Sequence, residues 1–190
     1  MKTIKENVNN EIIINKSRFI TYLYKVRDKE EINNYYEKLK KEYKDATHIC
    51  YAYILNNEMK YHDDSEPSGT AGLPILEVLK KNNLSYIICF VIRYFGGIKL
   101  GSGGLVRAYS NSCSQCLLKT TITPFEKNYK IKLEIDYQTN KLLNSIIDDN
   151  NILEKEFTDK IFYLLLINQE IKDKFDDLKI QYEILDNNYF

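Results

Sequence analysis

The sequence predicts an α+β protein with two domains, and three observations support this prediction. Apolar runs typical of strands alternate with runs in which apolar residues recur at helical spacing. All seven glycines lie between Gly69 and Gly104, so the other turns form without glycine. A proline-containing segment at 120–126 precedes a glycine-free remainder that has a regular pattern of its own. The expected domains are therefore residues 1–123 and 127–190.

Composition narrows the class of protein. The chain has 190 residues, of which 44% are hydrophobic, and its formal net charge is +0. This neutrality hides a basic centre, because residues 78–125 contain six basic residues and no acidic residue. No apolar run is long enough to span a membrane, and the N-terminus has no signal-peptide pattern. With four cysteines in no disulfide or zinc pattern, a cytoplasmic location without membrane contact is expected.

The first domain is expected to open with two strands, at 11–14 and 19–26. A helix should follow Asp28, which is a typical N-cap residue, and Glu31 is placed to complete a capping box. Apolar and aromatic residues then recur at helical spacing up to residue 43. The remaining elements expected in this domain are strands at 48–55 and 59–64, a helix at about 74–81, a strand at 85–93 and a helix at about 105–119.

The second domain shows a simpler order of elements. Its expected elements are a strand at 129–137, a helix at 139–149, strands at 153–158 and 162–168, a helix at 170–178 and a strand at 180–185. This β-α-β-β-α-β order is that of a ferredoxin-like domain. The segment contains no glycine, histidine or cysteine, so catalysis is not expected there.

The second glycine cluster belongs to a motif that runs from Arg93 to Tyr109. A glycine-rich turn between a strand and a helix exposes backbone N–H groups to an anion, and Lys99, Ser102 and Arg107 add two charges and a hydroxyl. The motif matches neither the Walker loop nor the dinucleotide fingerprint. A tight crossing of strand, loop and helix would need glycine equally, so both interpretations stay open, and Gly103 is expected at φ > 0. The expected anion- or nucleic-acid-binding residues are Arg93, Tyr94, Lys99, Gly101, Ser102, Gly103, Gly104 and Arg107.

An acidic motif surrounds the first glycine cluster. Three carboxylates, Asp63, Asp64 and Glu66, follow His62 and precede a predicted helix. They could pair with basic residues of the glycine-rich motif, bind a divalent cation or supply acid–base groups. We favour internal ion pairs and assign no metal ligand, cofactor or catalytic residue. The residues expected to face the anion site are Asp63, Asp64, Glu66 and Thr70.

At these two motifs the chain resembles the IMPACT/YigZ family. The matching positions of the acidic motif are Asp63, Asp64, Glu66, Pro67, Gly69, Thr70, Ala71, Gly72 and Pro74, and residues 93–109 match throughout. The chain departs from the family pattern at Ser65, where glycine is frequent. This departure puts in question whether the turn requires φ > 0.

The resemblance implies a fold and a function. It implies an N-terminal domain with the ribosomal protein S5 domain 2-like fold and a ferredoxin-like C-terminal domain similar to one in elongation factor G. Eukaryotic relatives regulate translation, and nucleic-acid binding is the usual proposal for bacterial relatives. We therefore expect a non-enzymatic protein that binds RNA, the ribosome or a translation-related protein, with sulfate or phosphate attracted to the glycine-rich motif. The alternative is a nucleotide- or phosphate-ligand enzyme that uses this motif beside Asp63, Asp64 and Glu66.

Overall fold

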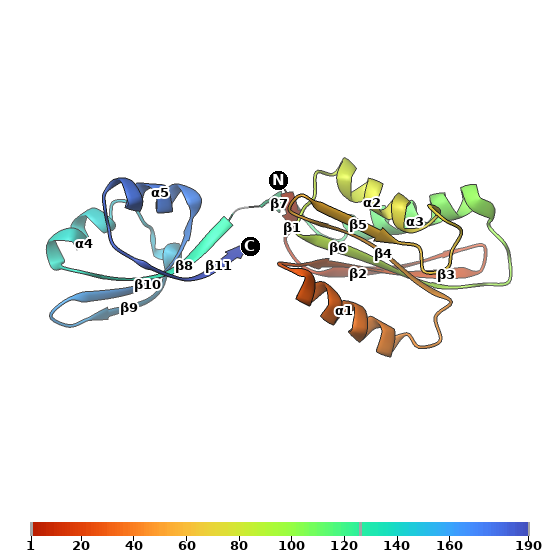
Figure 1. Ribbon diagram of the computed structural model, residues 1–190, viewed down its shortest axis with the longest axis horizontal. Helices are drawn as coiled ribbons and strands as arrows, with labels where there is room; N and C mark the ends of the chain where they lie inside the picture. The colour runs from red at the N-terminus through yellow and green to blue at the C-terminus, as the bar shows by residue number, and fades with distance from the viewer. Residues whose placement is uncertain (1, 126, 190) are drawn as a thin grey trace. The chain divides into compact units, whose positions relative to one another are not determined.

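The computed structural model describes residues 2–125 and 127–189 (Figure 1). The chain divides into two compact units, and the division lies between Pro124 and Phe125. The described residues contain three sheets and five α-helices, which confirms the prediction of a mixed α and β protein. No helix in this part of the chain is both long and apolar enough to cross a membrane. Each unit has its own sheet and its own hydrophobic core.

The first unit is built around a five-stranded antiparallel sheet. Its elements in chain order are β1 (Lys2–Ile4), β2 (Val8–Ile14), β3 (Ser17–Lys25), α1 (Lys29–Glu42), β4 (His48–Leu55), β5 (Glu58–His62), α2 (Gly72–Lys81), β6 (Ile87–Tyr94), α3 (Gly101–Leu117) and β7 (Ile122–Pro124). The strand order is β2-β3-β6-β4-β5, and β1 pairs separately with β7. Helices α2 and α3 cover one face of the sheet, whereas α1 covers the other (Figure 1).

Strand alternation divides the interior of this unit into two cores. In β6, Cys89 and Val91 pack toward α2 and α3, whereas Phe90 and Ile92 pack toward α1. Successive side chains of a strand point to opposite faces, so the same rule separates the last two residues of β6. Arg93 therefore lies on the α2–α3 side, next to Phe19, and Tyr94 lies on the α1 side.

The helix boundaries differ from the sequence prediction at several points. Asp28 caps α1 as expected, because its carboxylate accepts the N–H of Glu31 at 2.9 Å. The Glu31 carboxylate accepts the N–H of Arg27 instead of that of Asp28, so the predicted capping box is not formed. Helices α2 and α3 begin earlier than predicted, since glycines that read as loop residues occupy their first turns. The short β1–β7 pair carried no sequence signal and was missed.

The second unit has a four-stranded antiparallel sheet with two helices on one face (Figure 1). Its elements are β8 (Lys127–Ile135), α4 (Tyr137–Leu143), the 3-10 helix η1 (Asp149–Asn151), β9 (Ile152–Phe157), β10 (Ile161–Asn168), α5 (Gln169–Asp177) and β11 (Glu183–Tyr189). The strand order is β11-β8-β10-β9. The element order matches the prediction, but α4 is shorter than the helix predicted at 139–149 because the chain turns into η1.

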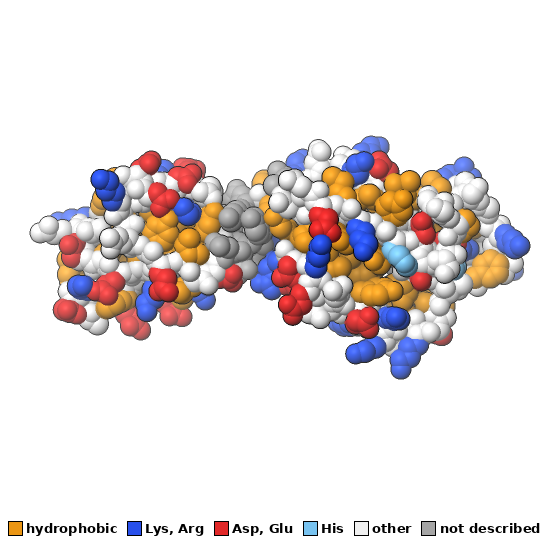
Figure 2. Space-filling view, in the orientation of Figure 1, with side chains coloured by type: hydrophobic (Ala, Val, Ile, Leu, Met, Phe, Trp, Pro, Cys, Tyr) orange, Lys and Arg blue, Asp and Glu red, His pale blue; other side chains and the backbone are white. Residues whose placement is uncertain are grey.

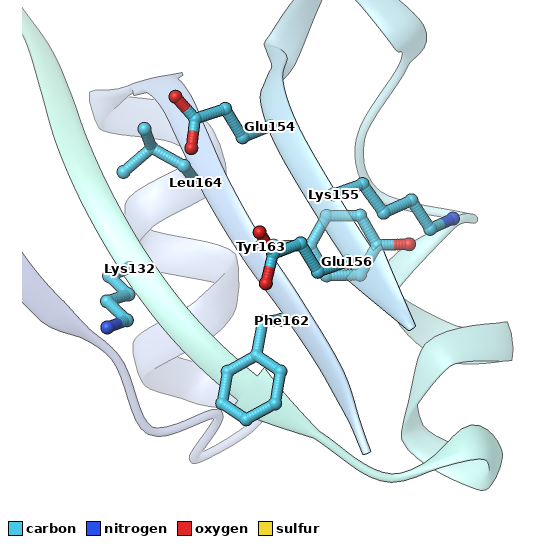
Figure 3. A pocket seen from close by; sticks show the side chains of 7 residues that line it. All are labelled: Lys132, Glu154, Lys155, Glu156, Phe162, Tyr163 and Leu164. Carbon is cyan, nitrogen blue, oxygen red and sulfur yellow. The ribbon is translucent and has the colours of Figure 1, made fainter. Parts of the chain in front are cut away.

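Part of the other face of this sheet holds a shallow depression of about 370 Å³ (Figure 3). In the register of the sheet, Leu164 of β10 lies between Lys132 of β8 and Glu154 of β9. The depression thus has an apolar middle with a cation on one side and a carboxylate on the other. None of its residues belongs to the acidic or glycine-rich motif.

Candidate functional site

Two loops of the first unit meet at the ends of β5 and β6. We call residues 63–72 the acidic loop and residues 96–104 the glycine-rich segment. The acidic loop leads from β5 into α2, and the glycine-rich segment leads from β6 into α3. Because β6 is the middle strand of the sheet and α2 packs beside α3, the two loops come together at one end of the unit.

Asp63 holds the acidic loop against the start of α2. Its carboxylate accepts three backbone N–H groups, from Gly69 at 2.9 Å, Ala71 at 3.1 Å and Gly72 at 2.8 Å. The first N–H groups of a helix have no partners within the helix, and a carboxylate there also interacts favourably with the helix dipole. Asp63 therefore caps α2 from a distance in sequence.

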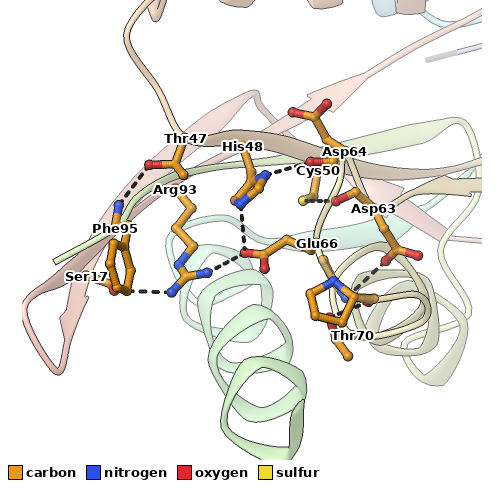
Figure 4. Close-up of polar contacts among 12 residues, drawn as sticks. Ser17, Thr47, His48, Cys50, Asp63, Asp64, Glu66, Thr70, Arg93 and Phe95 are labelled. Atoms are coloured by element: carbon orange, nitrogen blue, oxygen red, sulfur yellow. Dashed lines mark hydrogen bonds and ion pairs between the residues drawn. The ribbon is translucent and has the colours of Figure 1, made fainter. Parts of the chain in front are cut away.

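Asp64 and Thr70 also serve the loop itself. The Asp64 carboxylate accepts the N–H of Ile49 at 2.6 Å, and its carbonyl oxygen lies 2.6 Å from Nδ1 of His48 (Figure 4). The Thr70 hydroxyl donates to the carbonyl oxygen of Pro67 at 2.6 Å and is buried. Asp64 thus fixes the backbone of the acidic loop to β4, and Thr70 holds the loop by a bond within it.

Glu66 and Arg93 join the two loops through a buried ion pair (Figure 4). Arg93 Nη1 lies 2.6 Å from Glu66 Oε1, and the two side chains are 6% and 4% exposed. The predicted pairing between an acidic-loop carboxylate and a basic residue of the glycine-rich motif is thus confirmed for these two residues. Tyr109 of α3 donates to the same Glu66 oxygen at 2.8 Å, and His48 Nε2 lies 3.8 Å from it.

The surroundings of this pair are polar and largely buried. Arg93 Nη2 donates to the Ser17 hydroxyl at 3.4 Å, whereas its Nε has no hydrogen-bond partner among the described residues. Burial, together with the neighbouring Cys50 and Glu66, raises the pKa of Tyr109 well above its ordinary value. Burial likewise raises the pKa of Cys50. Both groups therefore stay neutral beside the ion pair at physiological pH.

Close backbone contacts explain two of the glycines. A Cβ atom on Gly96 would lie 2.0 Å from the backbone C and O atoms of Lys16, and one on Gly72 would lie 2.8 Å from the backbone N and O of His62. At Gly103 the situation differs, because a Cβ atom there would meet nothing within 4 Å and φ is not positive. The expectation of a positive φ at Gly103 is wrong, since this residue lies inside the first turn of α3.

A pocket of about 400 Å³ opens between the two loops. The lining residues are Thr47, His48, Glu66, Pro67, Arg93, Phe95, Lys99, Leu100, Gly101, Ser102 and Leu105. Four of the residues predicted for anion binding thus come together here, on a scaffold that the Glu66–Arg93 pair holds in place. The exposed ring of Phe95 lies beside the Arg93 guanidinium, with the guanidinium carbon 5.6 Å from the ring centroid.

Other predicted residues lie elsewhere. Gly104 and Arg107 line a separate depression of about 580 Å³ together with Asn15 and Ser114. The hydroxyl of Tyr94 donates to Asp45 at 3.0 Å on the α1 side of the sheet, away from the pocket. The Thr47 hydroxyl accepts the N–H of Phe95 at 2.9 Å. Sequence reasoning did not single out Ser17, Thr47 and Tyr109 as members of the polar network. Tyr109 closes the glycine-rich motif, and this position was the one signal that could have indicated its role.

The start of α3 has an electrostatic property that α2 lacks. Leu100 occupies the N-cap position and its side chain makes no capping hydrogen bond, and the first turn contains no acidic residue. The exposed Lys99 precedes this turn, and Gly101 and Ser102 line the pocket. First-turn N–H groups that have no side-chain cap in the described part of the chain, the helix dipole and a lysine are together suited to an anion. Within residues 2–125 and 127–189, no cluster of three or more His, Cys, Asp or Glu residues is arranged to hold a metal ion.

Comparison with known proteins places the chain in a family. The model of the Impact N-terminal domain matches residues 15–117, which include both motifs. A Haemophilus influenzae protein described as an IMPACT family member is 36% identical over 169 residues, covering 85% of this chain and 82% of the relative. The chain belongs to the IMPACT family.

Other relatives agree with this assignment. The Bacillus subtilis IMPACT family member YvyE is 51% identical over 118 residues, which are 60% of this chain and 54% of the relative. The match thus spans about half the length of that protein. A crystal structure described as that of a hypothetical protein has 28% sequence identity and a TM-score of 0.64, and the match covers 97% of both chains.

Proposed function

We propose that this IMPACT family protein is a non-enzymatic binding module that acts in translational regulation. It binds RNA, the ribosome or a translation-related protein through an anionic group placed at the start of α3. The observation that carries this proposal is the uncapped first turn of α3, which faces the pocket together with Lys99 and Ser102. Membership of the IMPACT family supports the link with translation, because the resemblance to this family implies relatives that regulate translation.

The fold of each unit supports the same proposal. The second unit has the β-α-β-β-α-β order and a β11-β8-β10-β9 sheet, which favour a ferredoxin-like domain. We assign the first unit to the ribosomal protein S5 domain 2-like fold on the family resemblance. Both folds occur in proteins of the translation machinery, although a shared fold alone does not establish function.

We further propose that residues 1–123 and residues 127–190 fold independently of each other. Limited proteolysis should then leave a folded fragment close to 1–124.

The contacts of the carboxylates argue against the enzymatic alternative. Asp63 is occupied by three backbone N–H groups, Asp64 by another and Glu66 by Arg93 and Tyr109. A general base or a metal ligand needs an oxygen that can reach the substrate or the ion. These three side chains are therefore better placed to shape the pocket than to react in it.

The test compares two charge reversals that lie on different sides of the start of α3. Lys99 lines the pocket, whereas Arg107 is an exposed cation of the same motif that lines the other depression. We expect Lys99→Glu to weaken binding of a fluorescent single-stranded RNA, or cosedimentation with ribosomes, by about tenfold and to lower the salt slope by about one. Arg107→Glu is the matched control and should have the smaller effect.

The results separate the hypotheses. Equal losses for Lys99→Glu and Arg107→Glu would mean that only the overall charge matters, and no loss would contradict the pocket as the binding site. Mg²⁺ and ATP could instead raise the melting temperature, and Lys99→Glu could abolish this rise without changing RNA binding. These two results together would favour the alternative, a nucleotide-dependent enzyme.

A further inference from the structure

A second surface of the first unit is a groove between α2 and α3, with a volume of about 360 Å³. Its apolar part is formed by Leu73, Pro74 and Val78 of α2 and by Val106 of α3. Leu73 and Val106 are 37% and 38% exposed, which is high for large apolar side chains on helices that also contribute to the core. Figure 2 shows hydrophobic side chains at the surface over this part of the unit.

The shape of the groove fits a helix. The side chains of Leu73, Glu77 and Lys81 line it at steps of four residues along α2, and Val106 and Ser110 line it at the same step along α3. Such i, i+4 rows form the ridges between which a third helix packs. Gly69 and Ser110 are small, so the backbone of an incoming helix can approach closely.

Two lysines, Lys80 and Lys81, and one carboxylate, that of Glu77, lie at the groove, and Glu77 and Lys81 line it. Its one acidic side chain, Glu77, is paired with Lys80 at 2.9 Å, which leaves Lys81 without an ion-pair partner among the described residues. No acidic residue occurs between Val78 and Phe125, so α3 contributes no carboxylate to the rim. A partner that places carboxylates beside its apolar residues is complementary to this surface.

We propose that the α2–α3 groove binds an amphipathic helix of a partner protein that has an apolar face and acidic flanks. Apolar side chains of this helix contact Leu73, Val78 and Val106, and a carboxylate pairs with Lys81. RNA is a poor occupant, because the groove offers apolar side chains where RNA would present phosphates. The groove shares no lining residue with the pocket at the start of α3, so this proposal does not rest on the proposed function.

The experiment uses the full chain and two designed helical peptides of about 16 residues, long enough to span the ten residues of α2. Both peptides carry leucines at i, i+4, i+7 and i+11, and they differ only in having glutamates or lysines on the flanks. Fluorescence anisotropy at low salt should show about tenfold tighter binding of the acidic peptide. Equal binding of both peptides, or no binding of either, would overturn the proposal.

Variants locate the binding surface. Val106→Glu should weaken binding of the acidic peptide at least tenfold, and Lys81→Glu should reverse the preference between the two peptides. Leu118→Glu is the control, because Leu118 is 77% exposed and lies outside the groove. Melting curves of each variant check that the fold is retained. If Val106→Glu leaves the affinity for the acidic peptide unchanged, or if Leu118→Glu lowers it equally, the groove is not the binding site. If the protein self-associates with rising concentration and Val106→Glu abolishes this, the groove binds a second copy of the chain, which also contradicts the proposal.

Discussion

Replacing Glu66 by glutamine tests whether the buried ion pair holds the two loops together. The carboxylate accepts hydrogen bonds from Arg93 at 2.6 Å and from Tyr109 at 2.8 Å, and the Glu66 and Arg93 side chains are almost fully buried. The amide keeps the shape of the side chain but leaves the guanidinium without a counter-charge. Removing one partner of a buried pair costs about 3–5 kcal/mol, so Glu66→Gln should lower the free energy of unfolding of the first unit by this amount.

The assay is urea unfolding of the full chain, followed by far-UV circular dichroism. The matched control is Glu11→Gln, because Glu11 pairs with Arg18 at 2.9 Å on the surface, where the two side chains are 44% and 48% exposed. An exposed pair contributes about 0–1 kcal/mol, so this control should stay close to wild type. The difference between the two variants measures the effect of burial and leaves out that of the substitution itself.

A double variant separates the ion pair from its surroundings. Arg93→Met alone should cost about as much as Glu66→Gln, because it leaves the carboxylate buried beside Tyr109. Combining the two should cost clearly less than the sum of the single effects, since neither charge is then left alone. If Glu66→Gln costs no more than Glu11→Gln, or if the two changes add, the pair does not hold the loops and the reasoning fails.

Three further predictions concern the glycines, a strained turn and the thiols. In thermal melts, Gly96→Ala should prevent folding or lower the stability severely, because its Cβ would clash with the backbone of Lys16. Gly103→Ala should instead raise the stability by about 0.5–1 kcal/mol, because alanine favours a helix more than glycine does. Equal effects of the two changes would contradict the close contact between Gly96 and Lys16. Ser65 has φ 66, so Ser65→Gly should stabilise slightly in urea titrations, by about 0.5 kcal/mol, whereas Ser68→Gly should not. Burial raises the pKa of Cys116 from 9.0 to about 12. The Cys116 thiol of the folded protein therefore stays protonated at pH values at which the same thiol of the unfolded chain ionises. The free energy of unfolding should then fall as pH rises above about 9. A thiol reagent at pH 8 should react with Cys116 only after unfolding.

The sequence predicts most of the elements of the fold because their signals are local. Helical spacing of apolar residues and an N-cap at Asp28 are enough to place α1, and apolar runs are enough to place β4 and β6. The β1–β7 pair depends on contacts between the two ends of the first unit, so no local pattern indicates it. The start of α3 was misplaced because glycine is a poor helix former, and packing decides the conformation of its first turn.

The candidate site was predicted in part. The two motifs and an ion pair between them follow from their charges, but the choice of carboxylate does not. The Asp63 carboxylate accepts N–H groups at the start of α2, and the Asp64 carboxylate accepts an N–H group of β4. Of the three carboxylates, Glu66 is therefore the one that pairs with Arg93. This division depends on how the acidic loop folds. Arg93 and Tyr94 are neighbours in a strand, so their side chains point to opposite faces of the sheet. This placement could have been predicted from the sequence.

The two helices that begin at the glycine clusters differ in how their first turns are satisfied. Asp63 supplies a carboxylate to the start of α2, where Gly72 is packed against the backbone of His62 in β5. At α3 the described part of the chain offers no side-chain cap, Gly103 faces open space, and Lys99 stands beside the first turn. The start of α2 thus has an internal carboxylate, whereas the described part of the chain places no side-chain cap at the start of α3. This contrast within one unit is the structural reason to look for a phosphate-bearing partner at α3.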